Sequence, residues 1–520
     1  MAQVNFAFSD LAELISIRKE EAIDTLTSLG FPAEETGEED GLTVEVTPNR
    51  PDALCVEGLA RILRCYKTGK PVGYEIGKPR IETYVDRSVE GVRPAFGCAV
   101  VRGVKMTDSF LRSLMQVQEK LHETLGRKRR KVAIGIHDLD KVEPPFRYFA
   151  CGRADVQFVP LEMEEKMTPE QILAAHPKGI GYAHLVGEKC PMIEDRNHDV
   201  LSFPPIINGE LTKLSGATTN LFIDTTGTSA EAVRQTVNIL VSMLADRGGK
   251  IEEAKINGLP YPLLQETAWP LLSTESDSLL GVKLTREEIG KLLSKMGHRI
   301  SGEHIHVPGY RTDIINKVDL IEDVAISYGF NNFEPTLPSF PSMGKRIPES
   351  ACHEAMMCLG YDEVITWNLS NGQLSEKAGL RAGEAVEIEN PLTQDFTIFR
   401  RSLLPNLLTV LSESKNEKLP MKIYEIGPVA MPRLEERLGI ASMHPRASFS
   451  EIKGAVMALA ESTGKKVEVR AKSLASFIEG RCAEIYLDGK PSGYFGEISP
   501  EVLSSFSLEQ PVCAAELKAF

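Results

Sequence analysis

The sequence has no C-x-x-C pair among its nine cysteines, which are scattered along 520 residues. Neither a zinc ribbon nor a thioredoxin-type redox site is therefore supported. An odd number of scattered thiols fits a reducing cytosol better than a disulfide framework. The sequence also has no cationic stretch followed by an apolar run at its start, and no apolar run near the roughly 20 residues of a membrane span. We therefore expect a soluble, cytoplasmic protein without a membrane partner.

A positive overall charge is missing as well, since the formal net charge is −14 at pH 7. This balance argues against broad, nonspecific binding to nucleic acid, although a local basic patch is compatible with it because steering depends on local fields. One such patch is the run RKRRK at residues 127–131. The run suits nucleic-acid phosphates, and it suits equally a solvated loop whose cations complement the end of a helix. The sequence leaves both interpretations open.

The length predicts several domains, because a single hydrophobic core stops growing at about 250–300 residues. Gly- and Pro-rich stretches near residues 70–94 and 334–344 indicate domain boundaries. The predicted fold class is α/β and α+β multidomain. The expected units are an N-terminal α+β domain at 1–90, an α/β domain at 91–265, a small α+β domain at 266–340, and a domain of helices and antiparallel strands at 341–520.

Hydrophobic periodicity predicts the main local elements. Apolar residues at helical spacing predict helices over residues 9–30, 107–125, 285–296 and 317–328, and a helix capped by Ser229 and ended by Gly248. Alternating apolar residues predict strands in GLTVEVT (residues 41–47) and in KVAIGIHDLD (residues 131–140). The pair Asp488-Gly489 predicts a tight hairpin between two C-terminal strands.

Small polar side chains are dense between residues 202 and 228, beside two proline-containing turns and a strand end. They are Ser202, Asn208, Ser215, Thr218, Asn220, Asp224, Thr225, Thr226 and Thr228. Loops on a rigid scaffold often carry binding sites, but the same residue types are also ordinary turn and cap formers. Both interpretations stay open on the pattern alone. His137, which follows the strand VAIGI, is expected to be a structural histidine outside any site.

Four carboxylates mark the stretch YRTDIINKVDLIEDVAISYGFNN at residues 310–332, namely Asp313, Asp319, Glu322 and Asp323. On a helix the last three lie at i, i+3 and i+4, opposite an apolar stripe of Val318, Ile321, Val324, Ala325 and Tyr328. An ordinary solvated helix face explains these three. However, like charges four residues apart are mildly unfavourable, and several carboxylates without His or Cys suit a hard cation such as Mg²⁺.

Seven segments, in order from near residue 40 to the C-terminus, carry a family likeness. They are VTPNRPDALCVEGLARIL, KVAIGIHDLDKVEPPFRY, LSFPPIINGELTKLSGATTNLFIDTTGT, YRTDIINKVDLIEDVAISYGFNNFEPTLP, FRRSLLPNLL, ASFSEIKG and GRCAEIYLDGKPSGYFGEISPEVL. Together they resemble the β subunit of phenylalanyl-tRNA synthetase. The compact length and the IGIHDLD…PPF block resemble the archaeal and eukaryotic type rather than the longer bacterial one.

The resemblance implies an editing module at 91–265 and a degenerate, catalytically inert class II synthetase-like core with an antiparallel sheet at 341–520. It implies an α subunit that uses ATP, an assembly of two α and two β subunits, and tRNA(Phe) as the nucleic-acid partner. It assigns an editing pocket to Ser202, Asn208, Asp224 and Thr226. It assigns a magnesium site, shared with the α subunit, to Asp313, Asp319, Glu322 and Asp323.

A separate editing site also has a physical reason. An apolar pocket shaped for phenylalanine rejects the added hydroxyl of tyrosine by only about two orders of magnitude, so accuracy requires hydrolysis of the wrong ester elsewhere. We expect Asp224 and Ser202 to read the tyrosine hydroxyl, and Asn208 and Thr226 to hold the ester and water. The expected function is support of ATP-dependent charging of tRNA(Phe) and hydrolysis of tyrosyl-tRNA(Phe).

The C-terminal region offers few arginines for ATP phosphates. Arg481 opens the segment GRCAEIYLDGKPSGYFGEISPEVLSSF, but no arginine follows where the helix SPEVLSSF begins, although Arg400 and Arg401 occur earlier. Adenylyl transfer depends on such cationic clamps. We therefore expect no charging activity from this chain alone. The alternative function is a non-catalytic scaffold or tRNA-binding relative whose editing pocket is dead.

Overall fold

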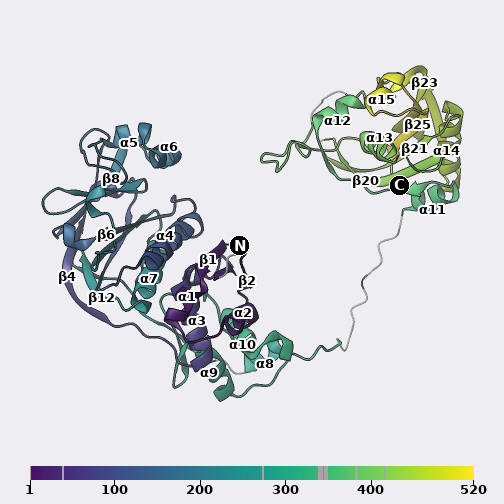
Figure 1. Cartoon of the computed structure of the whole chain (residues 1–520). Coiled ribbons are helices and arrows are strands. Elements are labelled where there is room, and N and C mark those ends of the chain that lie inside the picture. Colours follow the sequence, from purple (N-terminus) through teal and green to yellow (C-terminus); the bar gives the residue numbers. More distant parts are fainter. Residues whose placement is uncertain are drawn as a thin grey trace. The chain divides into compact units, whose positions relative to one another are not determined.

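The computed structural model describes residues 2–37, 40–271, 274–337, 344, 350–380, 385–414, 416–431 and 433–520. The chain divides into two compact units, Met1–Leu337 and Pro338–Phe520, and each is described by itself (Figure 1). The units separate next to the boundary expected near residue 340, whereas the positions near 90 and 265 lie inside the first unit. In the described part of the chain, no helix is both long and apolar enough to cross a membrane.

The first unit begins with a small three-stranded sheet in the order β1-β3-β2, formed by Ala2–Ala7, Gly41–Val46 and Ala33–Glu35. The single helix predicted over residues 9–30 is two helices, α1 (Phe8–Leu14) and α2 (Lys19–Ser28). The break has a local cause, because Ile15, Ser16 and Ile17 are weak helix formers and Ile15 is extended. The break still allows Leu11 and Leu26 to be fully buried against α3 (Val56–Thr68).

A ten-stranded sheet forms the centre of the first unit, with strand order β10-β9-β8-β7-β4-β12-β5-β11-β6 and β13 beside β12. The strands are β4 (Ile76–Val85), β5 (Ala95–Arg102), β6 (Val132–Asp138), β7 (Phe146–Gly152), β8 (Lys189–Glu194), β9 (Val200–Phe203), β10 (Ile207–Asn208), β11 (Leu221–Gly227), β12 (Lys250–Ile256) and β13 (Leu259–Tyr261). Because β4 pairs in parallel with β12 and β7, this sheet takes in residues before the boundary expected near residue 90.

Two long helices cover one face of this sheet, α4 (Asp108–Glu123) and α7 (Ala230–Asp246) (Figure 1). Their apolar residues join β5, β6 and β11 in one core that includes Phe110, Leu114 and Val237. Both helices confirm the periodicity prediction, and the Ser229 side chain caps α7 by accepting the Ala232 N–H. Two short helices, α5 (Pro169–Ala175) and α6 (Pro177–Tyr182), lie between β7 and β8 in the sequence.

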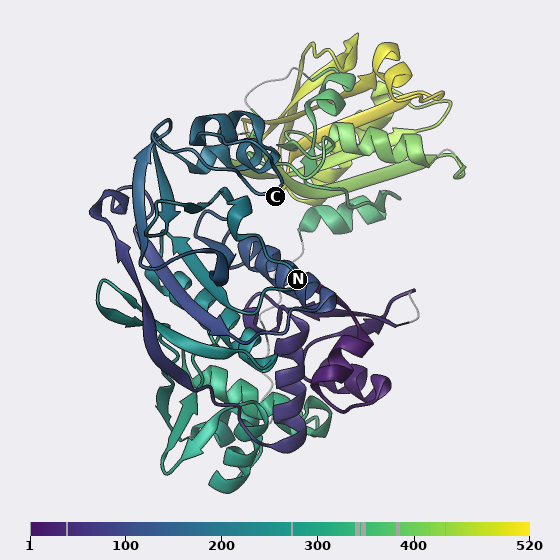
Figure 2. The same ribbon diagram turned by 60° about the vertical axis from the view of Figure 1, so that its left-hand side comes forward.

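A smaller α+β part completes the first unit. Its sheet has the order β14-β16-β15, formed by Thr267–Pro270, His304–Val307 and Arg299–Ser301. The helices α8 (Thr274–Leu280), α9 (Arg286–Lys295) and α10 (Lys317–Tyr328) accompany it, and α9 and α10 confirm two predicted helices. Contacts between α3 and α9 bring this part against the N-terminal helices. In Figure 2 the N-terminal helices are purple, and this part lies beside them in teal and green.

The second unit is built on a seven-stranded sheet with the order β17-β20-β21-β25-β24-β23-β22. Its strands are β17 (Asp362–Glu363), β20 (Met421–Ala430), β21 (Leu434–Met443), β22 (Val467–Ala471), β23 (Phe477–Leu487), β24 (Lys490–Ile498) and β25 (Val512–Lys518). All neighbouring pairs are antiparallel except β17 with β20. The antiparallel sheet and the hairpin turn at Asp488-Gly489, where both residues have positive φ, follow the sequence prediction.

Helices cover both faces of this second sheet. One core joins it to α11 (Ala351–Cys358) and α14 (Phe449–Ser462), and another joins it to α13 (Leu404–Glu413) and α15 (Pro500–Ser505). Alternate residues of β21 enter the two cores, because successive side chains of a strand point to opposite faces. The remaining elements are α12 (Gly372–Lys377) and the two-stranded pair β18 (Leu369–Ser370) and β19 (Ile398–Phe399).

Candidate functional site

The first unit contains a cavity of about 250 Å³ that is lined by all four residues predicted for the editing pocket, Ser202, Asn208, Asp224 and Thr226. Strands β9 and β10 stand at one end of the strand order and β11 and β6 at the other. Both ends line the same cavity, so the sheet curves back on itself. The volume lies just below the range of about 300–1,000 Å³ for small-ligand pockets, which suits one aminoacyl group.

Ser202 and Asn208 lie opposite each other on the short antiparallel pair of β9 and β10. Ser202 is only 2% exposed, yet its Oγ makes no hydrogen bond to any described residue. A buried hydroxyl without a partner costs about 1–3 kcal/mol, and native structures rarely leave one in that state. Since Ser202 lines the cavity, a ligand there would supply the missing partner.

Asp224 is held on the opposite wall by a histidine. His137 Nε2 lies 2.7 Å from Asp224 Oδ2, and its Nδ1 lies 2.7 Å from Thr212 Oγ1. A carboxylate only accepts hydrogen bonds, so Nε2 donates to Asp224, while the Thr212 hydroxyl beside Nδ1 also reaches the Gly209 carbonyl at 3.4 Å. Gly135 makes room for the pair, because a Cβ there would lie 2.0 Å from Asp224 Oδ2. One oxygen of Asp224 is thus fixed, and its carboxylate borders the cavity.

Thr226 lies two residues further along β11, on the same face as Asp224. Arg93 Nε donates to Thr226 Oγ1 at 2.9 Å, and Arg93 Nη2 donates to the Thr226 carbonyl at 2.8 Å. Arg93 is 4% exposed, and burial lowers its pKa to about 10. Because Oγ1 accepts from Arg93, the Thr226 hydroxyl proton is available to a group in the cavity.

His137 and Arg93 are the contacts that sequence reasoning missed, and His137 was expected to lie outside the site. The signal for His137 was present in the register of β6 with β11, where Gly135 faces Asp224 and His137 faces Phe222. Residues two apart on a strand share a face, so His137 and Asp224 are diagonal neighbours across the pair. The signal required knowledge that β6 pairs with β11. Arg93 had no comparable signal, since it lies in the loop before β5.

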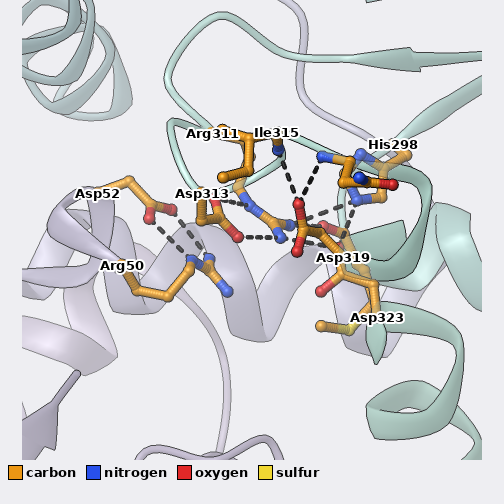
Figure 3. Close-up of polar contacts among 10 residues, drawn as sticks. Arg50, Asp52, His298, Arg311, Asp313, Ile315, Asp319 and Asp323 are labelled. Carbon is orange, nitrogen blue, oxygen red and sulfur yellow. Dashed lines mark hydrogen bonds and ion pairs between the residues drawn. The ribbon is translucent and has the colours of Figure 1, made fainter. Parts of the chain in front are cut away.

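The four acidic residues predicted as a cation site have different environments (Figure 3). Asp313 and Asp323 both pair with Arg311, whose Nη2 lies 2.7 Å from an oxygen of each. His298 Nε2 lies 2.6 Å from the same Asp323 oxygen. Burial raises the pKa of Asp313 and Asp323, but Arg311 and Arg50, joined by His298 at Asp323, together lower both pKa values below their usual range.

Asp319 and Glu322 lie apart from that ion-pair cluster. Asp319 Oδ2 accepts the N–H groups of Ile315 and Asn316 at 2.8 and 2.7 Å, as expected at a helix N-terminus, and Glu322 is exposed. The predicted solvated face is thus correct for Glu322 and wrong for Asp323, which is 4% exposed, while Val318 of the apolar stripe is 49% exposed. Among the described residues no three His, Cys, Asp or Glu side chains are grouped to hold a metal ion.

This arrangement does not fit a magnesium ion held by all four carboxylates of this chain. Arg311 already pairs with two of them, and Asp319 uses one oxygen to cap α10. Asp319 and Glu322, at i and i+3 on one helix, are the pair left for a cation, and any further ligands would have to come from outside this chain. The magnesium site stays a prediction, narrowed to these two residues.

Arg400 and Arg481 of the second unit both form ion pairs within the fold. Arg400 is 2% exposed, and its Nη1 lies 2.6 Å from Glu425 Oε1, while its Nε donates to the Pro428 carbonyl. Arg481, on β23, pairs with Glu497 on the neighbouring strand. The buried guanidinium of Arg400 is therefore not free to clamp a phosphate, whereas the Arg481 pair lies at the surface.

Three family models match the chain. They are the phenylalanyl tRNA synthetase beta chain CLM domain over residues 334–519, the tRNA synthetase B5 domain over residues 271–330, and the B3/4 domain over residues 94–247. The cavity residues fall within the B3/4 match, and the acidic helix α10 falls within the B5 match.

Known relatives extend this similarity to the whole chain. The phenylalanine–tRNA ligase beta subunit of Methanothrix thermoacetophila is 39% identical over 540 residues, covering 100% of this chain and 99% of the relative. That of Archaeoglobus fulgidus is 42% identical, covering 99% and 98%. The crystal structure of an N-terminal fragment of the phenylalanyl-tRNA synthetase beta subunit from Pyrococcus horikoshii aligns with a TM-score of 0.60 and 34% identity, covering 63% of this chain and 99% of the fragment. The chain therefore belongs to the family of phenylalanine–tRNA ligase beta subunits.

Proposed function

We propose that this chain supports ATP-dependent charging of tRNA(Phe) by an α subunit and hydrolyses mischarged tyrosyl-tRNA(Phe) in its cavity. The observation that carries the second activity is the buried, unpartnered Ser202 hydroxyl in a cavity that also holds Asp224. Both groups suit the phenol of tyrosine, since Asp224 accepts its O–H and Ser202 either donates to its oxygen or accepts from it. The phenol would satisfy the hydroxyl that the fold leaves unpaired.

The same polar groups explain why correctly charged tRNA would be spared. A site built to hydrogen-bond a substrate hydroxyl rejects the analogue without it by about 10⁴–10⁵, because buried polar groups are left unpaired. Phenylalanine would leave the Ser202 hydroxyl without a partner and Asp224 with His137 alone. Thr226, whose proton is free for a ligand, and Asn208 would then hold the ester and the attacking water. No step needs a covalent intermediate, since water placed at the ester is sufficient.

The discriminating experiment uses the complex of this chain with its α subunit. We expect the two to co-purify, the complex to charge tRNA(Phe), and the complex to deacylate tyrosyl-tRNA(Phe) faster than phenylalanyl-tRNA(Phe). A complex that charges tRNA but leaves the tyrosyl ester intact would favour the alternative, a scaffold with a dead pocket. Charging by this chain alone would overturn the assignment of an inert second unit.

The pairing of His137 with Asp224 makes a positioning role for the imidazole testable. We expect His137→Phe to lower deacylation of tyrosyl-tRNA(Phe) by roughly 10-fold, because Asp224 would lose the donor that orients it. His137→Gln, which keeps an amide donor, should retain most of the activity. Charging of phenylalanine by the complex serves as the control for both. Equal deacylation by the Phe variant and the wild type would contradict a positioning role.

The second unit and the acidic helix fit the other half of the proposal. With Arg400 and Arg481 engaged in ion pairs, ATP and phenylalanine would bind to the α subunit, in an assembly of two α and two β chains. Magnesium at Asp319 and Glu322 would require ligands from that partner, as a shared site does. Charging and proofreading of tRNA would take place in the cytoplasm, and we propose that location for the complex.

A further inference from the structure

The basic run at residues 127–131 forms a strained turn after α4. Three successive residues, Arg127, Lys128 and Arg129, have positive φ values of 48°, 53° and 64°. Residues other than glycine avoid this left-handed region at a cost of about 1–2 kcal/mol each, and such strain persists only where the surroundings enforce it. A helix end that only needed cations near its carbonyls would not need this conformation.

Contacts of Arg129 attach the turn to the cavity wall. Arg129 is 5% exposed, and its Nη1 donates to the carbonyl of Ile206 at 2.9 Å and to that of Pro205 at 3.4 Å. Its Nη2 pairs with Glu119 at 2.8 Å, and its guanidinium lies 4.7 Å from the centre of the Tyr182 ring. Pro205, Ile206 and Arg129 itself all line the cavity.

Arg93 joins the turn to the cavity a second time. The guanidinium that donates to Thr226 also donates to the carbonyls of Arg129 at 3.1 Å and Arg130 at 3.2 Å. One buried side chain thus holds both the backbone of the basic turn and a residue predicted to hold the ester. The turn and the cavity therefore form one rigid structure.

The remaining cations of the turn are exposed. Arg127, Lys128 and Arg130 lie at its surface. Lys178 and Lys213 line the cavity together with the exposed Glu162, and Lys213 pairs with Glu210 at 2.9 Å. This concentration of positive charge occurs on a chain with a net charge of −14. The main acidic neighbour of the turn, Glu119, is already neutralised by Arg129. A polyanion is the ligand that such a surface favours.

We propose that Arg127, Lys128 and Arg130 bind backbone phosphates of the single-stranded 3′ end of a charged tRNA and guide its aminoacyl ester into the cavity. This inference rests on the proposed editing function and specifies how its substrate is held. The exposed cations supply salt-sensitive affinity, while the buried Arg129 and Arg93 hold them at a fixed place beside the cavity. A rigid cationic turn fits a strand whose last nucleotide must end in one position.

The test compares two substrates in the complex with the α subunit. One is tyrosyl-tRNA(Phe), and the other is 2′(3′)-O-tyrosyl-adenosine, which carries the ester without phosphates. The variant is Arg127→Asn/Lys128→Asn/Arg130→Gln, because asparagine tolerates the left-handed backbone and removes the charge. We expect kcat/KM for the tRNA substrate to fall roughly 10- to 100-fold, mainly through KM, with no change for tyrosyl-adenosine.

Salt dependence gives a second measurement. Three lost phosphate contacts should reduce the slope of log(kcat/KM) against log[KCl] for the tRNA by about 2, since each single-strand contact contributes about 0.7. The matched control, Arg87→Gln/Lys250→Gln/Lys255→Gln, removes three charges from the same unit away from the cavity and should behave as the wild type.

Three outcomes would overturn the inference. An unchanged kcat/KM and salt slope on tRNA would show that the turn binds no phosphate. An equal loss on both substrates would show that the turn only supports the cavity. A wild type that hydrolyses neither substrate would remove the proposed editing function and this inference with it, and that result is distinct from the other two.

Discussion

Replacing Asp224 with alanine is expected to lower deacylation of tyrosyl-tRNA(Phe) by about 10²–10³-fold, the usual effect of losing one preorganised polar group that contacts the substrate. Asp224 is 1% exposed, borders the cavity and is oriented by His137 at 2.7 Å. Alanine would remove the acceptor for the tyrosine phenol and leave the imidazole without its partner. The measurement is single-turnover deacylation by the complex with the α subunit.

Two further variants sharpen this test. Asp224→Asn keeps an acceptor oxygen, so its loss should be smaller than that of alanine. Asp138→Asn is the matched control, since Asp138 is also buried on this sheet and accepts the Thr218 hydroxyl at 2.7 Å, but does not line the cavity. Charging with phenylalanine should be unchanged in all three. Wild-type deacylation by the alanine variant would reject Asp224 as a site residue.

Replacing Arg311 with methionine is expected to destabilise the first unit by about 3–5 kcal/mol, because removal of one partner leaves buried charges uncompensated. Arg311 is 5% exposed and carries two carboxylates, Asp313 and Asp323, as well as a hydrogen bond to the Met296 carbonyl. Methionine retains much of the packing volume, so the loss would report the charge. The loss of stability is measured by urea unfolding of the complex, from the midpoint of the earliest unfolding transition.

A control variant and the pH dependence show whether the loss of stability comes from the ion pairs of Arg311 or from general damage to the fold. Arg299→Ala, which breaks the exposed pair with Glu266, should leave the midpoint nearly unchanged. Arg311 holds the pKa of Asp313 and Asp323 below their unfolded values, so their contribution is fully present above about pH 4 and is lost as the pH falls below it. The difference between wild type and Arg311→Met should therefore narrow below about pH 4. A gap that stays constant would contradict the ion-pair account.

Local periodicity predicted the helices α4, α7, α9 and α10, because an apolar stripe at 3.6-residue spacing specifies which face a helix buries. Local periodicity failed to predict elements whose strand partners are remote in the sequence. Strand β4 was missed because its partners, β12 and β7, are remote in the sequence, and nothing within residues 70–94 reveals that it pairs in parallel on both sides. The break between α1 and α2 was missed because apolar residues continue through it.

The acidic helix shows why the spacing of residues in a motif does not determine which partners their side chains bind. The spacing of Asp313, Asp319, Glu322 and Asp323 suggested one shared ion, yet Arg311 stands two residues before the first of them. An arginine this close could have been read as a competing partner. Only the packed structure decides that its guanidinium reaches both Asp313 and Asp323 (Figure 3). The carboxylates of Asp319 and Glu322 are left outside this pairing.

The sequence by itself determined the local helices and strands and the family likeness, because these depend on residue identity and short-range spacing, and the likeness in turn assigned the four polar residues proposed for the cavity. The tertiary structure decided which side chains complete the site. His137 contacts Asp224, Arg93 contacts Thr226 and Arg129 lines the cavity through strand pairing and burial, and such contacts between distant segments have no local signature.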